Sequence, residues 1–166
     1  MVEIRSAVLG DVPGILAIYN EVIATSTAVY SDAPVSLENR RDWMEARQRQ
    51  GFPVLVGVDA RGVAGFSSFG EFRGAFSGYR HTVEHSVHIR SDLRGQGLGR
   101  KLVEALFPLA RARNVHVMIG AIDAANVGSI RFHERLGFEQ AGLFREVGRK
   151  FDRWLDLLFM QRLMEG

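Results

Sequence analysis

The chain has 166 residues, of which 46% are hydrophobic and 24% charged, and its formal net charge at pH 7 is +2. This is the composition of one globular domain over residues 1–166, and so small a charge gives no case for binding nucleic acid or a membrane surface. The absence of cysteine excludes disulfides, thiolate metal sites and a cysteine nucleophile.

Neither a signal peptide nor a membrane span is predicted. The N-terminus lacks the apolar run of a signal peptide, and no apolar stretch approaches the length of a span. We therefore expect a soluble cytoplasmic protein.

The first half of the chain predicts a strand, two helices and a hairpin. A short strand over Val2–Ala7 precedes apolar residues at helical spacing, Ile15, Ile18, Tyr19, Val22 and Ile23. Ser36 can cap a second helix over Leu37–Arg49, whose surface is rich in arginine and glutamate. Strands over Phe52–Val58 and Val63–Glu71 then flank the turn signal Asp59-Ala60-Arg61-Gly62.

The stretch Thr82–Arg113 carries the strongest functional signal. It begins as a strand with alternating residues and continues into the loop Gly95-Gln96-Gly97-Leu98-Gly99, where a helix starts. Glycines at a helix start let a ligand approach the backbone, and the first helical N–H groups are free to bind an anion. Arg94 and Arg100 add positive charge. This pattern predicts a phosphate or pyrophosphate site.

The remaining elements complete an α/β fold. Pro108 should bend the central helix, and the apolar run Val115–Ile122 reads as a strand buried on both faces. A further helix ends at Gly137. The last two strands are expected over Phe138–Glu146 and Arg153–Leu163, joined through Gly148-Arg149-Lys150. We expect a mixed, mostly antiparallel sheet of about six to seven strands, flanked by about four helices, with one parallel right-handed crossover.

The glycine loop has three generic interpretations. A nucleotide P-loop needs a Lys-Ser/Thr pair after the glycines, which Gly99-Arg100-Lys101-Leu102 does not supply. A dinucleotide fingerprint needs different glycine spacing and an early place in a βαβ unit. A purely structural glycine turn remains the third alternative.

The loop sequence Arg94-Gly95-Gln96-Gly97-Leu98-Gly99 resembles the R/Q-x-x-G-x-G/A signature of the GNAT superfamily of acyl-CoA-dependent N-acetyltransferases. The order of predicted elements matches that fold. Asn126 and the segment Phe132–Phe138 are similar to the second conserved segment of the superfamily. The segments Thr82–Val87 (TVEHSV) and Lys150–Asp156 (KFDRWLD) resemble the phosphinothricin acetyltransferase branch, which acetylates the α-amino group of small amino acids.

The resemblance implies acetyl-CoA as co-substrate and assigns its contacts. The pyrophosphate would bind the backbone of the glycine loop, and the pantetheine arm would lie along the preceding strand like an added strand. Asn126 would bond the cofactor or simply cap its helix. The cofactor-binding residues implied are Val87, His88, Ile89, Arg94, Gly95, Gln96, Gly97, Leu98, Gly99, Arg100 and Asn126.

Two catalytic candidates follow. Glu84 lies in an otherwise apolar strand, where a carboxylate is paired, hydrated or raised in pKa, and we expect it to accept the proton of the substrate amine directly or through water. The alternative is a salt bridge to Arg73 or Arg80. His133 occupies the position of a residue that protonates the leaving thiolate in many GNAT enzymes; the alternative is a packing role. His81, His85 and His116 show no metal-ligand spacing together, and no metal site is predicted.

A small amino-acid-like substrate would need an arginine for its carboxylate. By resemblance, the substrate-binding residues are Arg73, Gly74, Phe76, Glu84, His85 and Ser86. Arg73 could instead be a surface charge, and the loop Arg73–Arg80 is about one residue longer than the pattern of the branch. A protein N-terminus or a polyamine is the alternative substrate, and a non-catalytic acyl-CoA-binding module is the alternative class.

The branch also implies a homodimer. The C-terminal strands offer apolar residues at strand spacing for the contact, namely Trp154, Leu158 and Met160. Burial of these side chains within the monomer is the alternative.

Overall fold

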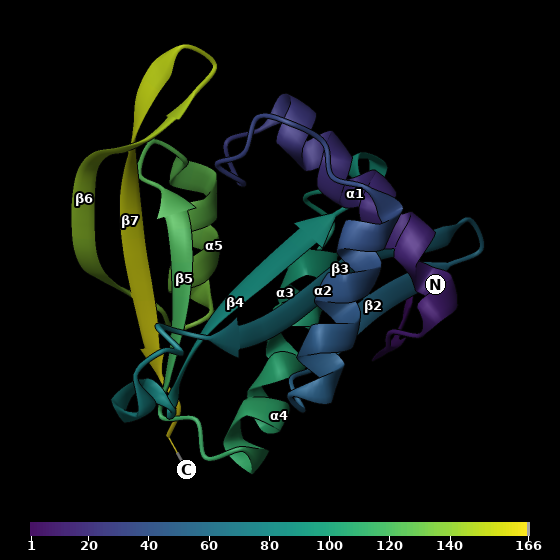
Figure 1. Ribbon diagram of the computed structural model, residues 1–166, viewed down its shortest axis with the longest axis horizontal. Coiled ribbons are helices and arrows are strands. Elements are labelled where there is room, and N and C mark those ends of the chain that lie inside the picture. The colour runs from purple at the N-terminus through teal and green to yellow at the C-terminus, as the bar shows by residue number, and fades with distance from the viewer. Residues whose placement is uncertain (166) are drawn as a thin grey trace.

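The computed structural model describes residues 1–165 and contains one seven-stranded sheet with the order β1-β2-β3-β4-β5-β7-β6 (Figure 1). The strands are β1 (Glu3–Ser6), β2 (Val54–Asp59), β3 (Gly62–Glu71), β4 (Thr82–Ile89), β5 (Val117–Asp123), β6 (Glu139–Lys150) and β7 (Arg153–Leu163). The helices are α1 (Val12–Thr25), α2 (Leu37–Arg49), α3 (Leu98–Glu104), α4 (Leu106–Ala112) and α5 (Val127–Arg135), with 3-10 turns η1 (Leu9–Asp11), η2 (Ser77–Tyr79) and η3 (Ser91–Leu93). The predicted fold class is confirmed.

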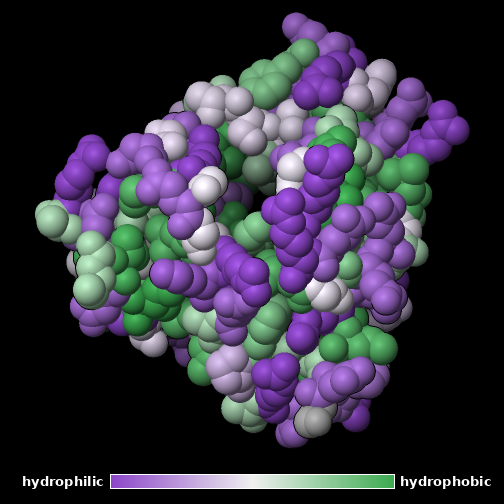
Figure 2. All heavy atoms as spheres, turned by 180° about the vertical axis from the view of Figure 1, so that it is seen from behind, coloured by the Kyte–Doolittle hydropathy of each residue, from purple (hydrophilic) through white to green (hydrophobic). Residues whose placement is uncertain are grey.

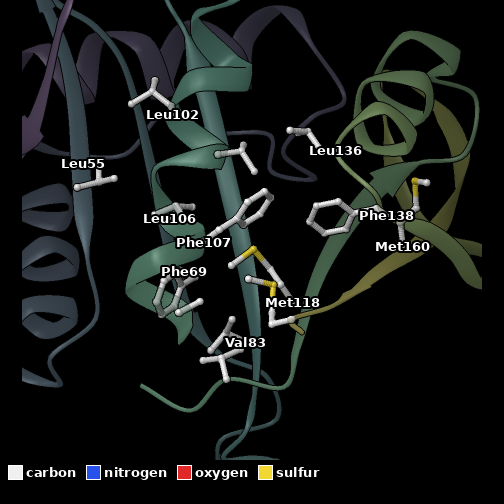
Figure 3. Close-up of a cluster of buried hydrophobic side chains, with 14 of the residues drawn as sticks. Leu55, Phe69, Val83, Leu102, Leu106, Phe107, Met118, Leu136, Phe138 and Met160 are labelled. Atoms are coloured by element: carbon white, nitrogen blue, oxygen red, sulfur yellow. The ribbon is translucent and has the colours of Figure 1, made fainter. Parts of the chain in front are cut away.

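Helices cover both faces of the first strands. On one face, α1 and α2 bury a cluster that includes Ile15, Met44 and Phe66. On the other face, α3 and α4 bury Leu102 and Leu106, in a larger cluster that continues through Phe69, Met118, Leu136, Phe138 and Met160 to the C-terminal strands (Figure 3). Burial of this apolar surface is the main force that holds the helices on the sheet.

The parallel pair β4–β5 is short. Only Thr82, Val83 and Glu84 pair with β5, opposite Val117–Ile119, whereas β4 pairs with β3 along almost its whole length. Beyond Glu84 the two strands separate, and Figure 1 shows β5, β7 and β6 turning away from the β1–β4 half. The sheet therefore opens into a fork whose sides are β4 and β5.

Local sequence signals explain several element ends. The Ser36 hydroxyl accepts a hydrogen bond from the Asn39 N–H (3.0 Å), as expected of an N-cap. The predicted bend at Pro108 is confirmed as a break between α3 and α4 at Ala105, because proline cannot donate to the Glu104 carbonyl. Gly137, with φ of 86°, follows α5 in the left-handed conformation that suits a C-terminal glycine.

The connection of the last two strands was predicted wrongly. β6 extends to Lys150, and the two-residue turn consists of Phe151 (φ 51°) and Asp152 (φ 59°). Positive φ at both positions matches the twist of a tight hairpin. Gly148 lies within the strand instead, where a Cβ would approach the Tyr30 ring to 2.4 Å, so this glycine is needed for packing and not for a turn.

Two burial predictions also need correction. β5 is not buried on both faces, because Ala121 is exposed at the opening of the fork. Of the residues expected at a dimer surface, Leu158 and Met160 are buried within the monomer, whereas Trp154 is 59% exposed. No helix in residues 1–165 is long and apolar enough to cross a membrane.

Candidate active site

Glu84 lies at the point where the fork opens. It is the last residue of β4 paired with β5, and its side chain lines a cavity of about 370 Å³. Residues of α1, α2, β4, β5 and α5 contribute to the walls of this cavity. Figure 2, which shows the molecule from behind, has a hollow near the middle of that face with hydrophilic side chains around its rim.

The environment of Glu84 favours its neutral form. Burial raises the pKa of the Glu84 carboxyl above its ordinary value, and the positive charge of Arg47 acts in the opposite direction. The predicted alternative of an ion pair with Arg73 or Arg80 does not occur in the described chain. A carboxylate with a raised pKa at the mouth of a cavity is suited to accept a proton near neutral pH.

His85 of β4 and His133 of α5 form a buried pair. Their Nε2 atoms are 3.0 Å apart, and His133 Nδ1 lies 2.7 Å from the Ser129 carbonyl oxygen. Because a carbonyl only accepts, His133 Nδ1 carries the proton, and the neutral ring then accepts at Nε2 from the Nε2–H of His85. His85 Nδ1 is left buried without a hydrogen-bond partner among the described residues. Burial lowers the pKa of both rings, that of His85 to about 3.

Ser86 and His88 lie on the same face of β4 as Glu84, and both line the cavity. The His88 ring packs between the rings of Tyr19 and Phe66, with centroid distances of 5.9 and 5.4 Å. Burial lowers the pKa of His88 to about 4, so the ring is neutral at pH 7. Its side chain is therefore part of the apolar wall.

The glycine loop borders a second cavity of about 440 Å³. The two cavities share Val87 of β4 and Phe132 of α5, so they meet along the free edge of β4. Gly95 and Gly97 have φ of 74° and 88°, and a Cβ on either would meet no atom within 4 Å. These glycines leave open space above the backbone at the start of α3, where a ligand can approach.

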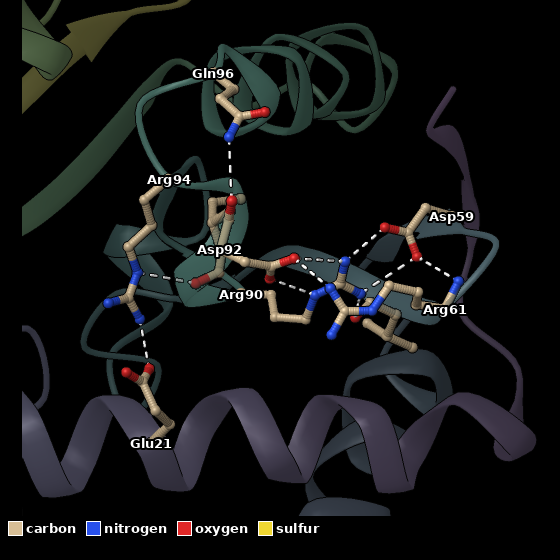
Figure 4. A network of polar contacts seen from close by, with 9 residues as sticks. Glu21, Asp59, Arg61, Arg90, Asp92, Arg94 and Gln96 are labelled. Carbon is tan, nitrogen blue, oxygen red and sulfur yellow. Dashed lines mark hydrogen bonds and ion pairs between the residues drawn. The ribbon is translucent and has the colours of Figure 1, made fainter.

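Arginine-centred ion pairs fix the turn before the glycine loop (Figure 4). Arg90 donates to Asp59 and to Asp92 (Nε to Oδ1, 2.7 Å), and Arg94 pairs with Glu21 of α1 and donates to the Ile89 carbonyl (3.1 Å). Gln96 donates to the Asp92 carbonyl (3.1 Å). The loop is thus tied to both α1 and β4. Arg94 and Arg100 both line the second cavity.

Asn126 borders the cavity that contains Glu84, whereas the loop Arg73–Arg80, predicted to bind the substrate, lies outside that cavity. The Asn126 side chain accepts from the Ser129 N–H (3.1 Å) as the cap of α5, and it also lines the first cavity. Arg73 (φ 51°) packs over the rings of Phe76 and Tyr79, and Gly74 and Phe76 border a separate hollow with η2. Within one chain, the structure does not bring Arg73, Gly74 and Phe76 to the cavity that holds Glu84.

Sequence reasoning placed Trp43 on the buried side of the second helix but missed the two arginines of α2 that line the cavity. Arg40, Trp43 and Arg47 of α2 line it together with Tyr19 of α1. The signal was present, since residues 40, 43 and 47 follow helical spacing on one face, but arginines on a polar helix were interpreted as a solvated surface.

The loop after α1, which lines the cavity with Ala28 and Val29, was also missed. Thr27 donates to Asp123 of β5, and the Tyr30 hydroxyl donates to the Asp156 carbonyl of β7 (2.9 Å). The buried Lys150 ammonium donates to the carbonyls of Ser26 (2.6 Å) and Val29 (2.8 Å). These bonds fasten the loop to the far side of the fork. Residues 1–165 contain no cluster of ligands suited to a metal ion.

Comparisons with known proteins identify the family. Residues 15–138 match the model of the acetyltransferase (GNAT) family. The chain is 54% identical over 160 residues to the L-methionine sulfoximine/L-methionine sulfone acetyltransferase of Pseudomonas paraeruginosa, covering 96% of this chain and 92% of that protein. Two solved structures are also similar, each with a TM-score of 0.94.

One of these structures is described as a ribosomal-protein-alanine N-acetyltransferase of Brucella melitensis (48% identity, covering 97% of this chain and 99% of that one). The other is a phosphinothricin acetyltransferase of Sinorhizobium meliloti in complex with acetyl-CoA (36% identity, covering 99% and 90%). The resemblance inferred from the glycine loop is confirmed, and an enzyme is favoured over a non-catalytic module. The chain belongs to the GNAT family of acetyltransferases, and acetyl-CoA is its co-substrate.

Proposed function

We propose that this enzyme acetylates the α-amino group of a small amino-acid-like substrate such as methionine sulfoximine, methionine sulfone or phosphinothricin. The observation that carries the proposal is the cavity at the fork, where a half-buried carboxylate and two arginines meet beside the free edge of β4. A site that binds a zwitterionic amino acid needs a negative group for its ammonium and a positive group for its carboxylate. The 54% identity to a methionine sulfoximine/sulfone acetyltransferase supports the same substrate class.

Acetyl-CoA would occupy the second cavity and the edge of β4. In this proposal the pyrophosphate binds the backbone of Gly95–Arg100, supported by the open space above Gly95 and Gly97 and by the charges of Arg94 and Arg100. The pantetheine arm lies along Val87–Ile89, where β4 no longer pairs with β5. When bound, acetyl-CoA supplies the acetyl group as a thioester.

Glu84 would accept the proton of the attacking amine. An α-amino group has a pKa of ~8, so a large share of it is protonated at neutral pH and cannot attack. Because the pKa of Glu84 is raised, it lies closer to the pKa of the amine. This favours transfer of the amine proton to the carboxylate, directly or through one water. A free N–H on the unpaired edge of β4 would donate to the negative charge that develops on the carbonyl oxygen.

His133 was predicted as a candidate acid for the leaving thiolate. In the neutral pair described above, its Nε2 is an acceptor from His85 and has no proton to give. We therefore favour a positioning role, in which the pair keeps α5 against β4 beside the thioester. An acid role would require the protonated ring, which burial disfavours.

A protein N-terminus is the second candidate substrate, because one similar structure is described as a ribosomal-protein-alanine N-acetyltransferase. The test is a panel assay with acetyl-CoA and thiol release as the signal. The panel contains methionine sulfoximine, methionine sulfone, phosphinothricin, a peptide that begins with alanine, and a polyamine. Turnover confined to the amino-acid analogues supports the proposal. Turnover of the peptide or polyamine alone, or no turnover while acetyl-CoA still binds, contradicts it.

We also propose that the enzyme is a homodimer that pairs through β6 and β7. Large apolar side chains are more than half exposed on this hairpin: Leu143, Phe144, Val147, Phe151 and Trp154. β6 is an edge strand and is exposed over most of its length. A second copy would cover this apolar surface.

A further inference from the structure

Two arginines of α2 face the active-site cavity without an acidic partner. Arg40 and Arg47 lie two helical turns apart on the same side of α2, and both line the cavity that contains Glu84. In the part of the chain that the structure describes, neither guanidinium forms an ion pair with a carboxylate. A partly buried cation that forms no ion pair is unfavourable, and a bound anion would relieve this cost.

Arg47 is held in position by its surroundings. Its guanidinium lies over the Trp43 ring, with Cζ 5.6 Å from the centroid, and Nη1 is 3.3 Å from the Ser68 hydroxyl. The guanidinium lies directly above Gly70, where a side chain would otherwise be. A Cβ on Gly70 would lie 2.3 Å from Nη1 and 2.5 Å from Cζ of Arg47. Glycine at this position of β3 is therefore what admits the guanidinium to the sheet surface.

Gly70 also fixes where Arg47 lies relative to the catalytic candidate. Gly70 is directly opposite Glu84 in the antiparallel β3–β4 register, and residues opposite each other share one face of the sheet. The guanidinium therefore lies beside the Glu84 side chain without forming an ion pair with it. Positive and negative groups thus stand next to each other on the cavity wall, as the ammonium and carboxylate do in an α-amino acid.

Arg40 extends the positive wall. Its guanidinium stacks on Tyr19 (4.1 Å from Cζ to the ring centroid) and on Trp43 (4.9 Å), and Nε donates to the Asn39 side chain (3.0 Å). Burial lowers the pKa of both arginines from their ordinary value, and the charge of Glu84 offsets part of this effect at Arg47. The aromatic stacking leaves N–H groups available for an anion.

We propose that Arg47, supported by Arg40, is the subsite that binds the carboxylate of the substrate and thereby makes the enzyme specific for amino acids. The inference rests on the proposed function and moves the carboxylate-binding arginine from the loop of Arg73 to α2. With its carboxylate on Arg47, the substrate presents its amino group to the neighbouring Glu84. Gly70 is a positioning residue for this subsite, because it leaves room for the guanidinium.

The test compares two substrates that differ only in the carboxylate: L-methionine sulfone and 3-(methylsulfonyl)propan-1-amine. We expect Arg47→Met to lower kcat/KM for the amino acid about 10- to 100-fold, the range for a lost charged hydrogen bond, and to change kcat/KM for the amine much less. Arg40→Met should give a smaller loss with the same selectivity. Arg41→Met, which removes an exposed arginine of the same helix, is the matched control. Dividing the ratio of the two kcat/KM values in each variant by the same ratio in the wild type cancels the difference in amine pKa between the substrates.

Gly70→Ala provides a variant that keeps every charge. Because its methyl group displaces the Arg47 guanidinium, it should reproduce the selective loss, and thermal unfolding shows whether the variant is folded. If Gly70→Ala does not fold, Arg47→Lys, which keeps the charge but not the planar fork, takes its place and should show a partial selective loss.

Four outcomes would overturn the inference. Equal losses for both substrates would mean that Arg47 acts only through Glu84 or the fold. The absence of any loss, or a selective loss in Arg73→Met instead, would place the carboxylate elsewhere. If the wild type acetylates neither compound, the proposed function fails, and calorimetric binding of L-methionine sulfone to the CoA-loaded protein decides the subsite. Binding that Arg47→Met abolishes supports it, and no binding to the wild type rejects it.

Discussion

Glu84 and Ile119 form the last pair of the β4–β5 ladder. Directly beyond this pair the strands separate, and the cavity begins. The carboxylate is therefore placed by the topology of the sheet, at the end of the only parallel strand pair in residues 1–165. It lies beside backbone groups of β4 that, within these residues, have no partner strand on that side. This geometry places a proton acceptor next to the edge proposed to hold the thioester.

The carboxylate of Glu84 should reduce stability at neutral pH. Its pKa is raised in the folded state, so the folded protein binds this proton more tightly than the unfolded chain does. The free energy of unfolding therefore falls as the pH rises from the pKa of the unfolded state through the pKa of the folded state. Glu84→Gln should therefore unfold at a higher temperature than the wild type at pH 7, and the gain should shrink as the pH approaches ~4. A lower unfolding temperature for the variant at pH 7 would contradict this.

Gly97→Ala should weaken acetyl-CoA binding. The residue has φ of 88°, and the added methyl group meets no protein atom, so the expected loss of stability is the cost of the backbone conformation alone, about 1 kcal/mol. The methyl group would occupy the space proposed for the pyrophosphate, and KM for acetyl-CoA should rise at least about 10-fold, the effect of ~1.4 kcal/mol.

Gly62→Ala is the control for this measurement, because Gly62 (φ 110°) also has open space and is the first residue of β3, paired with Asp59 at the end of the β2–β3 hairpin. It should be destabilised without a change in KM. Similar KM values for Gly97→Ala and the wild type would argue against the assigned phosphate site.

The buried pair of His85 and His133 should make the fold sensitive to acid. The pKa of His85 is lowered to about 3, against ~6.5 in an unfolded chain, so below pH 6.5 the unfolded state binds a proton that the folded state does not. Stability should fall as pH drops from 6.5 towards 3, by about 1.4 kcal/mol per pH unit from this residue once the pH is below ~6.

The check is urea unfolding at pH 7, 6 and 5. His85→Gln retains a donor for His133 but does not titrate, and its pH dependence should be shallower by about one proton. His116→Gln, which changes an exposed histidine, should follow the wild type. An unchanged slope in His85→Gln would show that the pair is not neutral and buried as described.

Val147→Glu should separate the proposed dimer. Val147 is 56% exposed on the edge strand β6, so the substitution leaves the monomer core unchanged and places a charge in the proposed contact. Sedimentation velocity should show a dimer for the wild type and a monomer with an unchanged thermal unfolding profile for the variant. A monomeric wild type would reject the dimer.

Much of the fold could be predicted from local signals. The cap at Ser36, the break at Pro108 and the end of α5 at Gly137 depend on residues close in sequence, and each lies where the sequence predicts it. The β6–β7 turn was misplaced because Gly148 looked like a turn residue, whereas it is needed for contact with Tyr30, which is distant in the chain.

The candidate site was only partly predictable for the same reason. Glu84 stood out as a carboxylate in an apolar strand, but its place at the fork depends on where β4 stops pairing with β5. Arg47 looked like a surface residue of α2, and only the space above Gly70 on another strand shows that it faces the cavity. The contact between His85 and His133 likewise requires α5 to pack against β4.

The pH dependence of kcat with L-methionine sulfone tests the role of Glu84 most directly. For the wild type, kcat should fall as the pH is lowered through the raised pKa of Glu84, because the protonated carboxyl cannot accept the proton of the amine. Glu84→Gln should lower kcat at pH 7 by about 10²- to 10⁴-fold and remove this limb of the profile, with KM for acetyl-CoA unchanged. A Glu84→Gln variant with the rate and pH profile of the wild type would contradict the assignment of Glu84 as the base.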